Sequence, residues 1–115
     1  MLYNSTKKQE LAAKVRLCQS IASKALGLMF SRPIKDFCLV FPFKCEQRVD
    51  LHMFFVFFPI DVLFLDSQKR VVETKENFRP FTYYSPKEKS RFVIELPVNT
   101  VKKTGTEIKD IISWD

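Results

Sequence analysis

The longest apolar run in the sequence covers residues 49–66, VDLHMFFVFFPIDVLFLD. A membrane helix of this composition would bury Asp61 and bend at Pro59, and both are unfavourable in a bilayer. Strands accept long aromatic and β-branched runs and tolerate proline at their ends. We therefore predict two strands, residues 52–57 and 61–65, which are apolar on both faces and should be central in a sheet.

Shorter apolar segments and turn residues predict the rest of the sheet. Pro42 should close a buried strand, because proline cannot donate to a ladder. The polar segment after it is expected to be a loop. The predicted elements are a strand at 37–41, a loop at 44–48, a turn at 66–69, the second arm of a hairpin at 70–74, an aromatic loop at 77–86, a strand at 91–96, one helical turn at 99–103 and a closing strand at 108–114.

The N-terminal third has two interpretations. From Leu11, apolar residues recur at helical spacing as far as Met29, which favours one helix. Residues 15–18 can equally end a short strand, with Ser20 then capping a helix through Lys24. Residues 1–10 are expected to be a flexible segment.

Composition limits the function more than it defines it. A chain of 115 residues with 46% apolar and 28% charged residues is expected to form one globular domain, residues 1–115. Only two glycines occur, Gly27 and Gly105. This excludes a glycine-rich phosphate loop and a dinucleotide-binding fingerprint.

Charge and cysteine content suggest a location and a class of partner. The formal net charge of +6 is compatible with an anionic partner, either single-stranded nucleic acid or an acidic protein. Cysteine occurs three times, an odd number without paired spacing, and no apolar leader precedes it. We therefore expect a reduced cytoplasmic monomer that does not enter a membrane.

Four blocks of the sequence resemble one family in order. They are GLMFSR at 27–32, LHMFFVFFPIDVLFLD at 51–66, RVVETKENFRPF at 70–81 and RFVIELPVNTVKKTGTEIKDIISW at 91–114. The chain is similar to an archaeal-type member of the family called domain of unknown function 192, which carries no agreed activity. The resemblance implies a mainly β domain, α+β by strict count: a compact β-sandwich or barrel-like domain with one short N-terminal helix. It also favours the strand followed by a helix in the N-terminal third.

Two turns depart from the pattern of that family. Residues 97–99 replace a glycine-rich turn, and Lys109-Asp110 replaces Gly-Asp. Asn99 can adopt the left-handed conformation that glycine would, whereas Lys109 does so at an energetic cost.

His52 and Asp61 are the candidate catalytic residues. If they face each other, the carboxylate would orient the imidazole as it does in a general base. No nucleophile or second carboxylate has a telling spacing. A buried, satisfied structural pair is therefore the favoured interpretation.

Metal and ligand binding have weaker support. The spacing C-x6-C-x6-H joins Cys38, Cys45 and His52, with Asp50 as a fourth ligand, but it matches no zinc knuckle. No cofactor is predicted. The phenylalanines at 54, 55, 57 and 58 are expected to fill the core rather than line a pocket. The candidate ligand-binding residues are Met29, Arg32, His52, Met53 and Asp61.

The segment ENFRPFTYYSPKEKSR, residues 76–91, mixes aromatic rings with cations. Rings stack on unpaired bases while cations contact phosphates, so this is the best nucleic-acid candidate. The alternative is an aromatic loop that folds over the end of a sheet. The candidate residues are Arg79, Phe81, Tyr83, Tyr84, Lys87, Lys89 and Arg91.

These observations favour a binding or accessory module without enzymatic activity. A small hydrolase or metal-dependent enzyme that uses His52 and Asp61 is the alternative. Binding of single-stranded nucleic acid through residues 76–91 is a further one.

Overall fold

The computed structural model describes residues 1–19 and 34–115. Their secondary structure is mostly strand with one short helix, which confirms the predicted mainly β class. The elements are β1 (Leu2–Asn4), β2 (Gln9–Ala12), β3 (Lys14–Leu17), β4 (Phe37–Gln47), β5 (Leu51–His52), β6 (Ile60–Leu65), β7 (Val71–Phe78), β8 (Tyr83–Tyr84), β9 (Ser90–Pro97), α2 (Thr100–Thr104) and β10 (Ile112–Trp114).

A five-stranded sheet in the order β3-β4-β9-β6-β7 forms the centre of the molecule. β3 and β4 are parallel, and the other neighbouring strands are antiparallel. All six residues of β6 are buried, and β6 pairs with β9 on one side and β7 on the other. The predicted central strand and its hairpin with the following strand are therefore confirmed.

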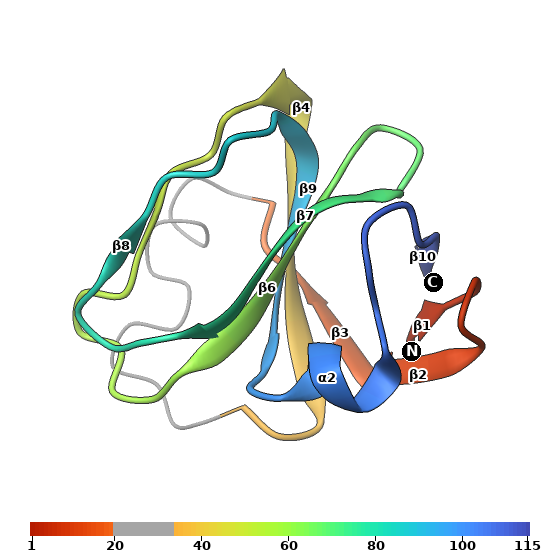
Figure 1. The fold of residues 1–115 in the computed structure, drawn as a ribbon, viewed down its shortest axis with the longest axis horizontal. Coiled ribbons are helices and arrows are strands. Elements are labelled where there is room, and N and C mark those ends of the chain that lie inside the picture. The colour runs from red at the N-terminus through yellow and green to blue at the C-terminus, as the bar shows by residue number, and fades with distance from the viewer. Residues whose placement is uncertain (20–33) are drawn as a thin grey trace.

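Side chains alternate between the two faces of this sheet, as the pleat requires. From β6, Ile60, Val62 and Phe64 enter a first apolar cluster, whereas Leu63 and Leu65 enter a second. A separate sheet, β10-β1-β2, and helix α2 contribute side chains to the second cluster, and residues 53–58 contribute to the first. Figure 1 shows the central sheet between these two layers, with β8 on the left and β1, β2 and β10 on the right.

The layers form a sandwich-like arrangement, and the sheets are not closed into a barrel. Helix α2 confirms the helical turn predicted at residues 99–103. The short N-terminal helix that was expected, with Ser20 as its cap, lies outside the described residues. Within the described ranges, no helix has the length and apolar character needed to cross a membrane.

Two predicted boundaries are wrong. β4 continues through Pro42 to Gln47, so the polar loop predicted at 44–48 is largely strand. The pairing of β4 with β9 shifts register between Pro42 and Gln47, and such a bulge accommodates a residue that cannot donate. The strand predicted at 52–57 shrinks to β5, because the chain turns after His52.

The N-terminal residues are part of the fold, where the sequence predicts a flexible segment at 1–10. β1 pairs with both β2 and β10, and Leu2 and Asn4 are fully buried. The Asn4 amide donates to Thr106 Oγ1 at 3.0 Å and to Asp110 Oδ2 at 2.9 Å. β3 confirms the strand interpretation of residues 15–17 against the helical one.

Both turns that depart from the family pattern adopt the left-handed conformation. Asn99 has φ 74° and Lys109 has φ 79°. The Lys109 amide donates to the Val71 carbonyl at 2.8 Å, which holds this turn against β7. Both residues therefore take the conformation that glycine would, and Lys109 does so in spite of its Cβ.

Candidate functional site: an aromatic platform beside a basic pocket

Two segments far apart in sequence are joined into one surface. β5 and β8 pair as a short antiparallel ribbon. Beyond it, the Met53 amide donates to the Thr82 carbonyl and the Phe81 amide donates to the Met53 carbonyl, both at 2.7 Å. The loop after β5 and the loop before β8 therefore form one hydrogen-bonded unit.

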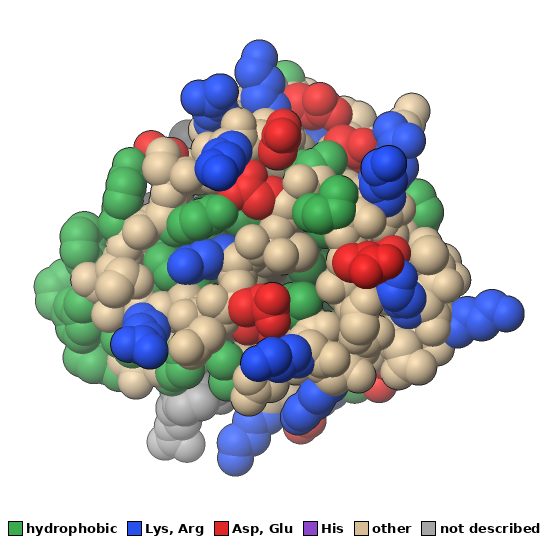
Figure 2. All heavy atoms as spheres, in the orientation of Figure 1, with side chains coloured by type: hydrophobic (Ala, Val, Ile, Leu, Met, Phe, Trp, Pro, Cys, Tyr) green, Lys and Arg blue, Asp and Glu red, His purple; other side chains and the backbone are tan. Residues whose placement is uncertain are grey.

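This unit carries a set of large aromatic side chains that face solvent. Phe81 lies in edge-to-face contact with Phe55 and Phe57, at centroid distances of 6.1 and 5.4 Å. Figure 2 shows hydrophobic side chains gathered at the left edge of the molecule, over this region. We call the exposed set the aromatic platform: Phe54 (49% exposed), Phe55 (46%), Phe57 (61%), Phe81 (50%) and Tyr83 (61%).

The backbone of the platform is strained. Phe55 and Phe81 both have φ 59°, a left-handed conformation that is uncommon for a bulky residue. Met53, Val56 and Phe58, which alternate with the exposed rings, are buried in the first apolar cluster. The surrounding structure thus holds the rings outward, and backbone strain of this kind clusters at functional sites.

The prediction that the phenylalanines of residues 54–58 fill the core is therefore only partly correct. Phe58 and Met53 lie in the core, but Phe54, Phe55 and Phe57 do not, and for these three the prediction is wrong. An uninterrupted apolar run does not distinguish a strand buried on both faces from a loop whose alternate residues are anchored. Pro59, which directly precedes β6, was the available sequence signal for a break in the strand.

Two carboxylates, Asp50 and Glu73, accept hydrogen bonds from the ribbon and from the loop that follows it. Asp50 accepts hydrogen bonds from the Tyr83 hydroxyl at 3.2 Å and the Ser85 hydroxyl at 2.7 Å. Glu73 of β7 accepts one from the Tyr84 hydroxyl, and its Oε1 accepts from the amides of Lys87 and Glu88, both at 2.9 Å.

Burial, followed by the bond to Glu73, raises the pKa of Tyr84 to about 12. The Tyr84 hydroxyl therefore remains a hydrogen-bond donor across the physiological pH range. The loop that follows β8 thus has a defined course.

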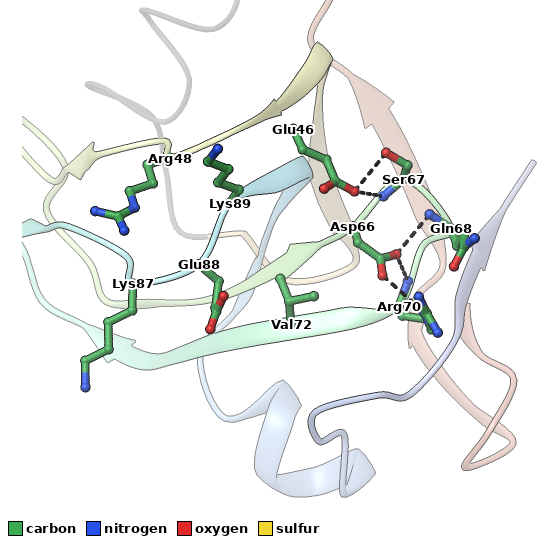
Figure 3. Close-up of a pocket in the computed structure, with 10 residues that line it drawn as sticks. All are labelled: Glu46, Arg48, Asp66, Ser67, Gln68, Arg70, Val72, Lys87, Glu88 and Lys89. Carbon is green, nitrogen blue, oxygen red and sulfur yellow. Dashed lines mark hydrogen bonds and ion pairs between the residues drawn. The ribbon is translucent and has the colours of Figure 1, made fainter.

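A polar pocket of about 580 Å³ lies next to this loop. Its walls come from the end of β4, the turn at 66–70 and residues 87–89 (Figure 3). Arg48, Lys87 and Lys89 line it, are exposed, and form no ion pair with any described carboxylate. We call it the basic pocket.

The predicted pair of His52 and Asp61 does not form. His52 is exposed, stacks on Phe54 at 5.0 Å, and accepts a hydrogen bond at Nδ1 from the Phe54 amide at 3.3 Å. Asp61 is 1% exposed and accepts from the amides of Asn77 at 3.0 Å and Val101 at 2.9 Å. The buried-pair interpretation is wrong, and the structure does not assemble the general base that this pair would make.

The cysteines and the other candidate ligands are dispersed. Cys38 is fully buried in the second apolar cluster, where burial raises its pKa to about 12, and Cys45 is exposed on the same strand. In the part of the chain that the structure describes, no three His, Cys, Asp or Glu residues lie together in a way that could hold a metal ion. Met29 and Arg32 lie outside the described residues.

The nucleic-acid candidates are divided between two places. Phe81 and Tyr83 belong to the aromatic platform, and Lys87 and Lys89 to the basic pocket; Arg79 is exposed two residues before Phe81. Tyr84 and Arg91 are half-buried and engaged elsewhere, since Arg91 Nε donates to the Phe43 carbonyl. The sequence interpretation missed the three exposed phenylalanines of residues 53–59 and Arg48, which lie outside the segment considered.

The chain matches a family model and archaeal proteins along nearly all of its length. The model of DUF192, described as Uncharacterized ACR, matches residues 3–114. A UPF0127 protein of Thermococcus sibiricus is 37% identical over all of this chain and 75% of its own length. A UPF0127 protein of Pyrococcus horikoshii is 34% identical over 99% of this chain and 98% of its own length.

Two crystal structures share the fold. One, from Sinorhizobium meliloti and provisionally described as a transcription regulator, has a TM-score of 0.81 and 27% identity, covering 86% of this chain and 79% of its own. The other, a protein of unknown function from Novosphingobium aromaticivorans, has a TM-score of 0.81 and 21% identity, covering 87% and 74%. These matches extend the fold to other proteins without giving a defined activity.

Proposed function

Because this chain belongs to DUF192, a family of uncharacterized proteins, we propose its function from its own surface: it is a binding module, and its ligand is single-stranded nucleic acid. The aromatic platform carries this proposal. Five large rings are held outside the core by a hydrogen-bonded and partly strained backbone.

Exposed rings suit unpaired bases because every base presents a flat face. Stacking of one base on one aromatic side chain contributes about 1–3 kcal/mol and requires little sequence preference. Phe57 and Tyr83 are the most exposed members of the platform, at 61% each. They are the rings on which we expect bases to stack.

The charge around the platform has the sign that nucleic acid needs. The chain has a formal net charge of +6, and the exposed Arg79 lies between Phe78 and the platform ring Phe81. An acidic protein would be drawn to the same charge. The charge alone would suffice for an acidic protein, whereas nucleic acid uses both the charge and the exposed rings. The Sinorhizobium relative, provisionally described as a transcription regulator, is consistent with such a ligand.

The test is fluorescence anisotropy with labelled single-stranded RNA and DNA of about 12 nucleotides, within the range of known site sizes. We expect Phe57→Ala and Tyr83→Ala each to weaken binding about tenfold, the effect of losing roughly 1.4 kcal/mol of stacking. Ile108→Ala is the matched control, because Ile108 is a 49% exposed apolar residue between α2 and β10.

Three outcomes would overturn the proposal. They are no binding even at about 50 mM salt, where phosphate contacts are strongest, equal loss of affinity in the control, and stronger binding of a duplex of the same length. In the last two cases the platform would not be the stacking surface. In the first case a partner would be sought among acidic proteins.

A further inference from the structure

We infer that the basic pocket is a phosphate-binding subsite, and that it takes a backbone phosphate of the strand whose bases stack on the aromatic platform. The second part rests on the proposed function, whereas phosphate binding by the pocket can be tested without it.

The three unpaired cations lie around the pocket, on both sides of one ribbon. Arg48 precedes β5, and Lys87 and Lys89 follow β8. In Figure 3 the Arg48 guanidinium and the Lys87 ammonium both point to the left of the view, away from Asp66. Because β5 and β8 are paired, the order of the chain fixes these cations on neighbouring backbones.

Two of the acidic residues in the pocket are occupied by donors of the adjacent turn. Glu46 Oε2 accepts from the amide and the hydroxyl of Ser67, both at 2.9 Å, and these bonds lower its pKa. Asp66 accepts from the amides of Gln68 and Arg70 at 2.9 and 3.0 Å and forms an ion pair with Arg70 at 3.0 Å. Both carboxylates therefore organise the turn at 66–70.

The charge left over favours an anion. The lining contains four cationic side chains and three carboxylates, a formal net charge of +1. Asp66 and Arg70 neutralise each other, and the remaining acid, Glu88, points downward in Figure 3, away from Arg48. Phosphate is the anion that several flexible cations around an open pocket suit best, because its charge is spread over several oxygens.

The position of the pocket fits a strand that also reaches the platform. Arg48 is four residues before His52, and Lys87 is four residues after Tyr83, on the two arms of the ribbon. At no more than about 3.3 Å per residue, Lys87 lies within roughly 13 Å of the platform ring Tyr83 along the backbone. A short single strand can therefore contact both at once.

The first measurement is the salt dependence of oligonucleotide binding for Lys87→Gln/Lys89→Gln. Each phosphate contact contributes about 0.7 to the slope of log affinity against log salt for a single strand, so loss of the one phosphate in the pocket should lower the slope by about 0.7. Lys102→Gln/Lys103→Gln is the control. It removes the same charge from exposed positions on α2, and its slope should remain close to that of the parent protein.

The second measurement is an NMR titration of the intact protein with inorganic pyrophosphate. We expect shifts in the amides of Ser67, Gln68 and Lys87, and their loss in Lys87→Gln/Lys89→Gln but not in the α2 control. If these shifts appear but oligonucleotides do not bind, the pocket binds phosphate and the proposed function is rejected.

Failure of the inference has a different signature. If oligonucleotides bind through the platform, while pyrophosphate shifts nothing and the two double variants have equal slopes, the pocket is not a phosphate subsite and the proposed function stands. Equal slope changes in both double variants would mean that only net charge matters, which also overturns it.

Discussion

Glu95 lies on β9, on the face of the sheet that carries Val93 and the first apolar cluster. No described residue donates a hydrogen bond to its carboxylate or pairs with it. Burial raises the pKa of Glu95 to about 7, and the Glu95 charge also contributes to the raised pKa of Cys18, after burial. An acid whose pKa is higher in the folded state than in the unfolded chain destabilises the fold when it ionises.

The stability of the protein should therefore depend on pH through Glu95. Below the unfolded pKa of 4.5, Glu95 is protonated and does not lower the free energy of unfolding. As pH rises toward 7 the free energy of unfolding falls, and above that it changes little. After allowance for its partial exposure, we expect a loss of roughly 2 kcal/mol. Glu95→Gln should remove this part of the pH dependence in urea unfolding at pH 5 and pH 8, and parallel profiles for the two proteins would reject the assignment.

Lys109 is a second residue whose local chemistry opposes the fold. Its φ of 79° costs roughly 1 kcal/mol or more for a residue with a Cβ, whereas glycine adopts it freely. Glycine also gains freedom in the unfolded chain, so we expect Lys109→Gly to raise the free energy of unfolding by about 0.5 kcal/mol. Chemical denaturation would measure it. Lys102→Gly in α2, where glycine has no such advantage, should lower stability instead.

Among the elements, Asp61 joins the hairpin of β6 and β7 to helix α2, which is distant in sequence. From β6 it accepts hydrogen bonds from the Asn77 amide of β7 and the Val101 amide of α2. Asp61→Ala leaves two amides without their acceptor in a nearly sealed site, and we expect a loss of about 3 kcal/mol. Asp61→Asn keeps one acceptor oxygen and should lose less.

His52→Ala is the natural comparison for the Asp61 variants. His52 is exposed, so we expect its removal to change the free energy of unfolding by no more than about 0.5 kcal/mol. Thermal unfolding of the three variants distinguishes this arrangement from a His–Asp pair. Equal losses in His52→Ala and Asp61→Ala would favour the pair.

The sequence predicts the elements that are defined by local signals. β6, its hairpin with β7, the turn of α2 and the left-handed Asn99 and Lys109 all follow from apolar runs, turn residues or the family resemblance. β1 does not, because the burial of Leu2 and Asn4 depends on pairing with β10, more than a hundred residues later.

The aromatic platform cannot be predicted from local sequence signals either, because it also depends on contacts between distant residues. Its rings face outward because Met53 bonds to residues 81 and 82, a contact that no periodicity records. The candidate segment 76–91 contained only half of the surface, since the other half comes from residues 53–59. The pairing of β5 with β8 and the backbone bonds of Met53 bring the two together.

In the whole molecule, the central sheet separates two unlike layers. One contains β1, β2, β10 and α2 over the second apolar cluster, and the other contains the ribbon β5–β8 with the aromatic platform. Recognition and stability should therefore respond to different substitutions. The comparison of one buried and one exposed residue tests this.

Leu2→Ala should lower the free energy of unfolding by about 2–4 kcal/mol, because Leu2 is fully buried in the second cluster. Phe57→Ala should leave stability within about 0.5 kcal/mol, because its ring is 61% exposed. Urea denaturation followed by far-ultraviolet circular dichroism measures both. A large loss in Phe57→Ala would show that the platform is part of the core after all.

The rings lie on two loops that are joined by hydrogen bonds, and Met53, Val56 and Phe58 anchor these loops in the core. This arrangement could be used in protein engineering. The positions between these anchors can be randomised while the opposite layer keeps the chain folded. Libraries in residues 54, 55, 57, 81 and 83 would then resemble the hypervariable loops of an immunoglobulin domain, mounted on a chain of 115 residues that contains no disulfide among its three cysteines.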